Sequence, residues 1–224
     1  MVKFIYIYCM KKNKRNIYNE NIPDQDNVDY TSDEPDFDIN SPEYLFKQID
    51  YGFNLDNEII YLHGEIKAQE TLYSIMQAVN IILRYRTEER LNEPISISIN
   101  SGGGDVLEML GIIDYIRSLS IPVNIVCRGQ ACSAAAWILS MGTGIRAMSK
   151  HSTLMLHEGI YSFEDKFHSA KSSLEYFSFL EDVGYKMLEE KTGIESTFWK
   201  DKCRVDWYLT PDEALKLKLI DKII

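Results

Sequence analysis

The chain has 224 residues, enough for one domain with a sizeable core and a terminal extension. A net charge of −10 argues against non-specific binding to nucleic acid or to an anionic membrane surface, because both require an excess of basic side chains. The four cysteines show no paired spacing, so we expect free thiols in a reducing compartment; they are Cys9, Cys127, Cys132 and Cys203.

The first fifty residues differ in composition from the rest. Residues 1–19 combine aromatic side chains with five basic ones, whereas residues 20–43 hold nine acids and no lysine or arginine. Such a segment buries too little apolar surface to offset its chain entropy. We therefore predict a disordered or loosely docked extension over residues 1–50 and a folded domain over residues 51–224. The basic and acidic parts could also bind each other or a partner, although a solvated extension is the simpler interpretation.

Neither a leader nor a membrane span is predicted. Residues 1–10 form too short an apolar run for a signal peptide and lack a small-residue cleavage site. Residues 129–145 are uncharged but contain polar residues and glycines, which indicates a buried helix instead. The expected protein is soluble and cytoplasmic.

From residue 51 onward, strand and helix patterns alternate. Strand patterns at 58–64, 94–100 and 122–127 are separated by helical patterns at 70–86 and from Asp105 to about 116. This alternation through residue 150 predicts an α/β fold with a largely parallel sheet and right-handed crossovers. Further on, the pattern predicts a strand at 152–157 and a last helix opened by a capping box, Thr210-Pro-Asp-Glu.

Residues 164–191 form the longest predicted helix. One apolar stripe runs through Phe167, Ala170, Leu174, Phe177, Leu180, Gly184 and Met187, and a second through Tyr176, Phe179 and Val183. A helix that is apolar on two sides is usually buried on two sides. We therefore expect one side of this helix to form an interface with another subunit.

Ser133 lies where a buried strand meets a helix-forming run of alanines. Gly129 allows a sharp turn before it, and the free N–H groups of a helix N-terminus can stabilise a developing negative charge. Ser133 is therefore a candidate nucleophile, but serine is also a preferred N-cap residue, so a capping role is the alternative. Cys132 is a rival nucleophile, although it is expected to point into the core.

Two further residues could complete such a site. His157 ends the strand pattern at 152–157, and Asp206 precedes the last helix. Taken singly, His157 could be an ordinary histidine at the edge of the core and Asp206 an ordinary loop acid. His63, His151 and His168 have no motif around them. No metal-ligand cluster occurs, and the glycines at 102–104 lack the lysine of a phosphate-binding loop.

Four ordered motifs together resemble the Clp protease proteolytic subunit, a serine peptidase. They are Asn-Ser-Gly-Gly-Gly at 100–104, Gly-Gln-Ala-Cys-Ser at 129–133, the histidine ending an apolar strand, and Asp206 before Leu-Thr-Pro-Asp-Glu-Ala. The resemblance covers about residues 52–224. It implies a spiral of repeated strand-strand-helix units, shared with the crotonase-type enzymes, and a protruding handle helix at the long helical pattern.

The resemblance also implies roles for particular residues. Ser133 would be the nucleophile, His157 the general base and Asp206 the residue that orients it, with no cofactor and no metal. The backbone N–H groups of Gly104 and Ala134 would form the oxyanion hole. Substrate-binding positions would be Gly103, Glu158 and Gly159.

Four positions depart from the family pattern. Gly102 stands where the family usually has proline, which loosens the glycine loop. His-Glu-Gly at 157–159 replaces His-Gln-Pro, and Val205 replaces the arginine that helps couple ring contacts to the alignment of the triad.

As a member of this family, the protein would be an ATP-independent serine endopeptidase subunit. It would assemble with itself into rings, expected as stacked heptamers, and cleave peptides or unfolded proteins that a separate AAA+ unfoldase delivers. Three alternatives stay open: a phage-type processing protease, a non-catalytic subunit of a mixed ring, and an enzyme of the same spiral fold acting on coenzyme A thioesters.

Overall fold

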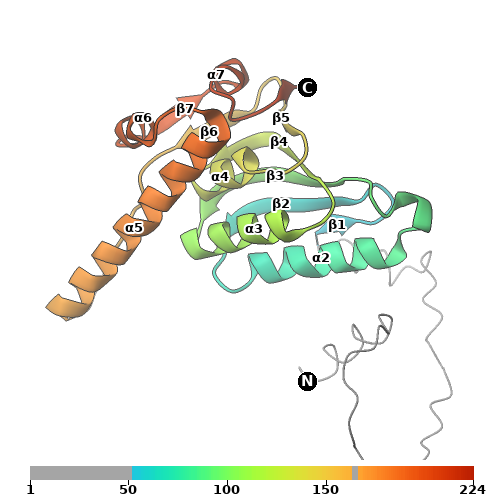
Figure 1. Ribbon diagram of the computed structural model, residues 1–224, viewed down its shortest axis with the longest axis horizontal. Helices are drawn as coiled ribbons and strands as arrows, with labels where there is room; N and C mark the ends of the chain where they lie inside the picture. Colours follow the sequence, from blue (N-terminus) through green and yellow to red (C-terminus); the bar gives the residue numbers. More distant parts are fainter. Residues whose placement is uncertain (1–51, 163–165) are drawn as a thin grey trace, which may run out of the picture. The chain divides into compact units, whose positions relative to one another are not determined.

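The computed structural model describes residues 52–162 and 166–224 of the chain (Figure 1). The extension predicted over residues 1–50 lies outside the described residues, so its boundary with a domain at 51–224 stays a prediction. Among the described residues, no helix is long and apolar enough to cross a membrane.

A mixed sheet of eight strands organises the described residues (Figure 1). The main path runs β1-β2-β3-β4-β5-β8, and β6 continues beside the second half of β4 and pairs with β7. Between strands of the described residues, only the β1–β2 and β6–β7 pairs are antiparallel, which confirms the largely parallel sheet predicted from the alternating pattern. The strands are β1 (Phe53–Asn54), β2 (Ile59–Ile66), β3 (Ile95–Gly104), β4 (Val123–Cys132), β5 (Arg146–Met148), β6 (Thr153–Leu156), β7 (Trp207–Leu209) and β8 (Lys222–Ile223).

Side-chain caps open the helices α3 and α7. Asp105 accepts a hydrogen bond from the backbone N–H of Glu108 at the start of α3, and Thr210 and Glu213 form the predicted capping box of α7. The helices are α2 (Thr71–Tyr85), the 3-10 turn η2 (Glu88–Arg90), α3 (Val106–Ser118), α4 (Ala134–Ser140), α5 (Phe167–Thr192), α6 (Ser196–Lys202) and α7 (Pro211–Lys216).

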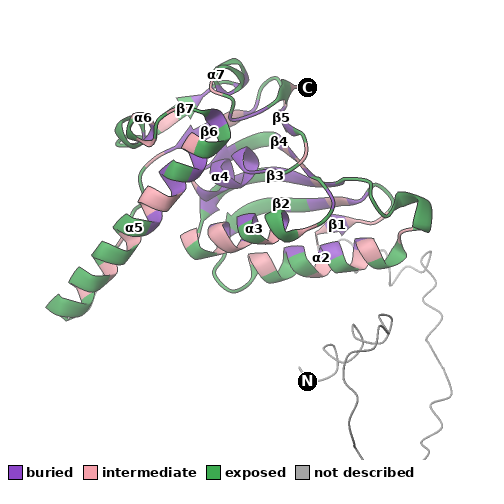
Figure 2. Ribbon diagram, in the orientation of Figure 1, coloured by how far each residue is buried: buried purple, intermediate pink, exposed green. Residues whose placement is uncertain are grey.

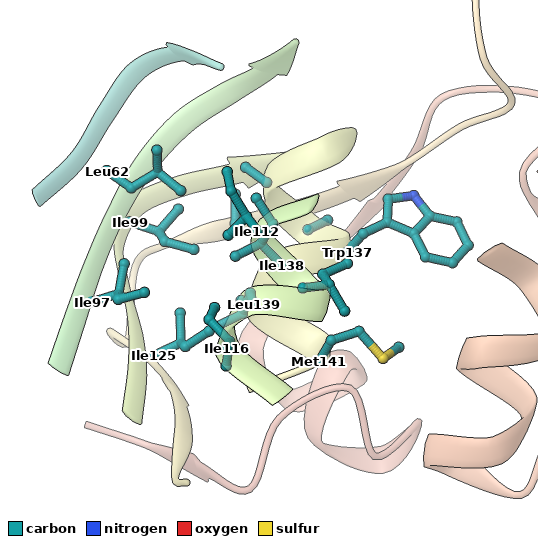
Figure 3. Packing of buried hydrophobic residues seen from close by; sticks show 14 of the residues in the cluster. Leu62, Ile97, Ile99, Ile112, Ile116, Ile125, Trp137, Ile138, Leu139 and Met141 are labelled. Carbon is teal, nitrogen blue, oxygen red and sulfur yellow. The ribbon is translucent and has the colours of Figure 1, made fainter. Parts of the chain in front are cut away.

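The core lies between the central strands and the helices α3 and α4. Parallel pairing brings Ile97 of β3 opposite Ile125 of β4, and both side chains are fully buried. The isoleucines and leucines of α3 and α4 cover them, as Figure 3 shows for Ile112, Ile138 and Leu139. Each such side chain contributes on the order of 1.5–3 kcal/mol through burial, so the central strands and α4 form a firm platform.

The two ends of α5 differ in burial (Figure 2). From Leu180 onward one face packs on the chain's own core, with Gly184 and Leu188 buried. In the first half, by contrast, Phe167 and Phe179 are exposed. Among the described residues, the helix is therefore not buried on two sides over its whole length.

Candidate active site

Ser133 occupies a strained turn between β4 and α4. Its φ of 53° and ψ of −128° are unusual for a residue other than glycine, and strain of this kind is found where a side chain must be presented in a set direction. The backbone N–H of Ser133 donates to the carbonyl of Met155 at 2.8 Å, which ties the turn to β6. Ser133 stands at the N-cap position of α4, but its side chain makes no capping hydrogen bond. The capping alternative is therefore wrong.

The hydroxyl of Ser133 instead meets His157. His157 Nε2 lies 2.8 Å from Ser133 Oγ, within hydrogen-bond distance. Because β6 runs parallel to β4, with Met155 paired to Cys132, the two side chains emerge at the same edge of the sheet. The His157 ring is only 15% exposed, so its position is held by the surrounding structure.

Asp206 approaches the other ring nitrogen of His157 more loosely. The antiparallel pairing of Leu156 with Trp207 places His157 opposite Asp206, one residue beyond the pair on each strand. The distance from His157 Nδ1 to Asp206 Oδ1 is 3.7 Å, an ion-pair separation rather than a hydrogen bond. The side chain of Asp206 is 59% exposed. The structure thus brings the three residues together in order, with one close and one open contact.

The glycine loop at the end of β3 lies against the serine turn. Gly103 has a φ of +98°, and a Cβ there would lie 2.6 Å from the carbonyl oxygen of Cys132 and 2.7 Å from Ser133 Cβ. Only glycine fits this approach without displacing the turn. A Cβ at Gly102 would meet nothing within 4 Å, so glycine is not sterically required where the family usually has proline.

A cleft of about 650 Å³ opens over these residues. Of the predicted site residues, it is lined by Ser133, Ala134, Gly104, His157, Gly159 and Asp206. Gly103 and Glu158 are not among its lining residues: Gly103 packs beneath Ser133, and Glu158 is exposed. Sequence reasoning missed the wall that α5 contributes through Phe177, Leu180, Glu181, Gly184 and Tyr185.

The wall of the cleft depends on close packing between α4 and α5. A Cβ at Gly184 would lie 3.2 Å from the ring of Trp137, so glycine lets the helix approach the indole. Trp137 also packs on Tyr185, with ring centroids 5.7 Å apart. Leu180 and Gly184 belong to the first apolar stripe of the helical pattern, spaced one turn apart. In the sequence, that spacing indicated that this side of the helix packs against something, but it could not identify the residues that it contacts.

Cys132, the rival nucleophile, does not face the cleft. Its side chain is buried, and its Sγ lies 3.8 Å from Gln130 Oε1. Burial raises the pKa of the Cys132 thiol, and the nearby charge of Asp206 adds to the effect. The thiol therefore stays protonated at neutral pH and is a poor nucleophile.

The chemistry available here is that of a hydroxyl activated by an imidazole. Within residues 52–162 and 166–224, no three histidine, cysteine or acidic side chains gather in a way that could hold a metal ion. A serine hydroxyl within reach of a histidine, with a carboxylate behind it, is the arrangement used for acyl transfer.

Comparison with known proteins confirms the resemblance. Residues 47–224 match the family model described as Clp protease. The chain belongs to the Clp protease family. Membership makes it a peptidase by family, within the hydrolases. The mixed α/β fold with its eight-stranded sheet is consistent with this assignment.

Relatives within this family are similar to most of the chain. The ATP-dependent Clp protease proteolytic subunit 1 of Prochlorococcus marinus (strain MIT 9312) is 30% identical over 175 residues, spanning 78% of this chain and 87% of that protein. The ATP-dependent Clp protease proteolytic subunit 2 of Synechococcus sp. (strain CC9605) is 31% identical over 175 residues, spanning 78% of this chain and 86% of that protein. The similarity therefore extends over most of both chains.

Proposed function

We propose that the protein is the serine endopeptidase subunit of a self-compartmentalised protease, with Ser133, His157 and Asp206 as its catalytic triad. The observation that carries the proposal is the 2.8 Å contact between Ser133 Oγ and His157 Nε2. It is supported by the strained backbone of a serine that does not cap its helix.

The reaction follows from these positions. Ser133 Oγ attacks the carbonyl carbon of the scissile peptide bond while His157 Nε2 accepts the hydroxyl proton. The tetrahedral intermediate collapses, the C–N bond breaks, and His157 returns the proton to the departing amine. Water, activated by the same imidazole, then hydrolyses the ester on Ser133 and restores the free hydroxyl.

The developing oxyanion requires donors close to Ser133. We assign this role to the backbone N–H groups of Gly104 and Ala134, both of which line the cleft. Ala134 is the first residue of α4, whose leading N–H groups have no acceptor within the helix. The close approach of Gly103 to Ser133 holds the glycine loop where such donors are needed.

Assembly and a partner belong to the same proposal. The relatives are named as subunits of ATP-dependent proteases, which supports an assembly of this chain with itself and cooperation with a separate AAA+ unfoldase. We propose that α5 is the handle helix and that its exposed aromatic half packs against a second subunit, because exposed apolar surface of this kind marks interfaces. The processing-protease and mixed-ring alternatives differ from this proposal in partner and activity.

An activity-based probe tests the catalytic proposal. A fluorophosphonate reacts with an activated serine hydroxyl, so it should label the intact protein at Ser133, and Ser133→Ala should abolish both labelling and peptide hydrolysis. The matched control is Cys132→Ala, which should still be labelled. Labelling that survives Ser133→Ala but disappears in Cys132→Ala would overturn the assignment. A correctly folded, assembled wild-type protein that resists the probe would favour a non-catalytic ring subunit.

A further inference from the structure

The segment that follows His157 is held by α5 through one carboxylate. The backbone N–H of Gly159 donates to Glu181 Oε1 at 2.6 Å. One residue earlier, the N–H of Glu158 donates to the carbonyl of Cys203 at 2.6 Å. Two successive backbone groups after the histidine are therefore fixed, one of them to the long helix. A hydrogen bond to a charged acceptor is stronger than one between neutral groups, so the Glu181 contact is a firm one.

Tyr161 reinforces the same attachment. Its ring packs on Phe177, one helical turn before Glu181, with ring centroids 4.7 Å apart. Burial, the charge of Glu181 and hydrogen bonding with Glu181 raise the pKa of Tyr161 to about 12, so the phenol stays protonated. A Cβ on residue 159 would clash with the Tyr161 hydroxyl, so any residue other than glycine there would require the Tyr161 side chain to move.

These contacts account for a departure from the family pattern. A proline at position 159, as in His-Gln-Pro, has no N–H to donate, so it could not make the bond to Glu181. Its ring carbons would also meet Tyr161. One connected unit thus links α5 to the segment two residues after His157; it consists of Gly159, Tyr161 and Glu181.

We propose that Glu181 is a positioning residue, which holds the His157 segment in register with Ser133 from the face of α5 through the N–H of Gly159. The inference rests on the proposed function, because it assigns a role in aligning the base of that same site. A displacement of α5 would then move the imidazole away from the hydroxyl while leaving the serine turn in place. The strained turn is anchored separately, by β6 and the glycine loop.

Two variants of nearly equal size separate positioning from packing. Glu181→Gln keeps an oxygen that can accept the Gly159 N–H, whereas Glu181→Met fills similar space without an acceptor. We expect Glu181→Met to slow fluorophosphonate labelling of Ser133 by about tenfold, the kinetic equivalent of one lost hydrogen bond to a charged group. Glu181→Gln should stay within about threefold of the wild type. The small probe reports on the Ser133–His157 pair without requiring peptide contacts.

Controls keep the test decisive. Glu190→Met removes an exposed acid from the same helix and should label at the wild-type rate. Melting temperature and assembly size are measured for every variant. If Glu181→Met does not fold, Glu181→Asp replaces it, because the shorter side chain keeps the charge but cannot span the same distance; it should also label slowly.

The outcomes distinguish this inference from the proposed function. Wild-type labelling rates in folded Glu181→Met or Glu181→Asp, or an equal loss in Glu181→Met and Glu181→Gln, would overturn the positioning role while leaving Ser133 as the nucleophile. Failure of the wild-type protein to label at Ser133 would instead overturn the proposed function itself.

Discussion

The two contacts of His157 differ in how they are built. On one side, Ser133 and the histidine come from the ends of adjacent parallel strands, β4 and β6, above the buried core. Their reactive atoms lie 2.8 Å apart. On the other side, Asp206 stands in the connection before the three-residue strand β7, 3.7 Å from the imidazole and 59% exposed.

The difference indicates which part of the site the single chain determines. Parallel strands with a packed core leave the serine and the histidine little freedom. The position of Asp206 depends on residues at the surface, since its neighbour Val205 is 71% exposed. Within the single chain, Ser133 and His157 already lie at hydrogen-bond distance, whereas His157 and Asp206 do not. Catalytic hydrogen bonds are commonly long in the unliganded state.

The largest expected effect concerns the close contact. His157→Ala removes the only group within 2.8 Å that can accept the Ser133 proton among the described residues, so peptide turnover should fall by about 10⁴ or more. Hydrolysis of a short fluorogenic peptide measures this loss, with Cys132→Ala as the folded control. A fall of less than about tenfold would mean that another group serves as base.

Asp206→Asn tests the open contact and should cost less. An aspartate orients the base rather than transferring the proton, and here it starts beyond hydrogen-bond distance. Its loss of turnover should be at least about tenfold smaller than that of His157→Ala in the same assay. Equal losses would show that Asp206 and His157 are in close contact in the working enzyme. The contrast drawn here between a close serine contact and an open aspartate contact would then be wrong.

Disturbing the exposed half of α5 should affect assembly first and activity second. Tyr176→Glu with Phe179→Glu places two charges on exposed apolar positions of this helix. We expect smaller assemblies by light scattering coupled to size exclusion. Peptidase activity should fall by about tenfold, because the proposed contacts of a second subunit with α5, which also forms a wall of the cleft, are lost. Glu175→Gln on the same half is the control. A wild-type protein that is monomeric at micromolar concentration, yet fully active, would contradict this prediction.

The smallest effect is expected at Cys132. Its raised pKa leaves less thiolate at pH 7–8 than a free cysteine has, so iodoacetamide should alkylate it slowly, and faster only as pH rises. Cys132→Ala should change turnover by less than about threefold, because the thiol is buried beside the serine turn and does not line the cleft. Mass spectrometry of the alkylated native protein, against denatured protein, measures the difference.

Much of the fold and the family could be predicted from the sequence, because both depend on local patterns. Short apolar or alternating segments located β2, β3 and β4. Helical spacing located α2 and α3, a run of helix-forming residues located α4, and the alternation of strands and helices indicated a parallel sheet. The short strands β1, β5, β7 and β8 were not predicted, since two or three residues carry no period. The ordered glycine, serine, histidine and aspartate motifs were specific enough to identify the Clp protease family.

Only the tertiary structure decided how the site residues meet. The residues next to Ser133 could not by themselves distinguish a helix cap from a nucleophile, because both use serine at the same junction. The direction of its hydroxyl depends on β6 and the glycine loop. The wall that α5 builds through Glu181 and Gly184 was equally hidden, because an apolar stripe shows that a helix packs but not against what. Contacts between residues far apart in the chain depend on how strands pair and helices pack, and local pattern carries no record of them.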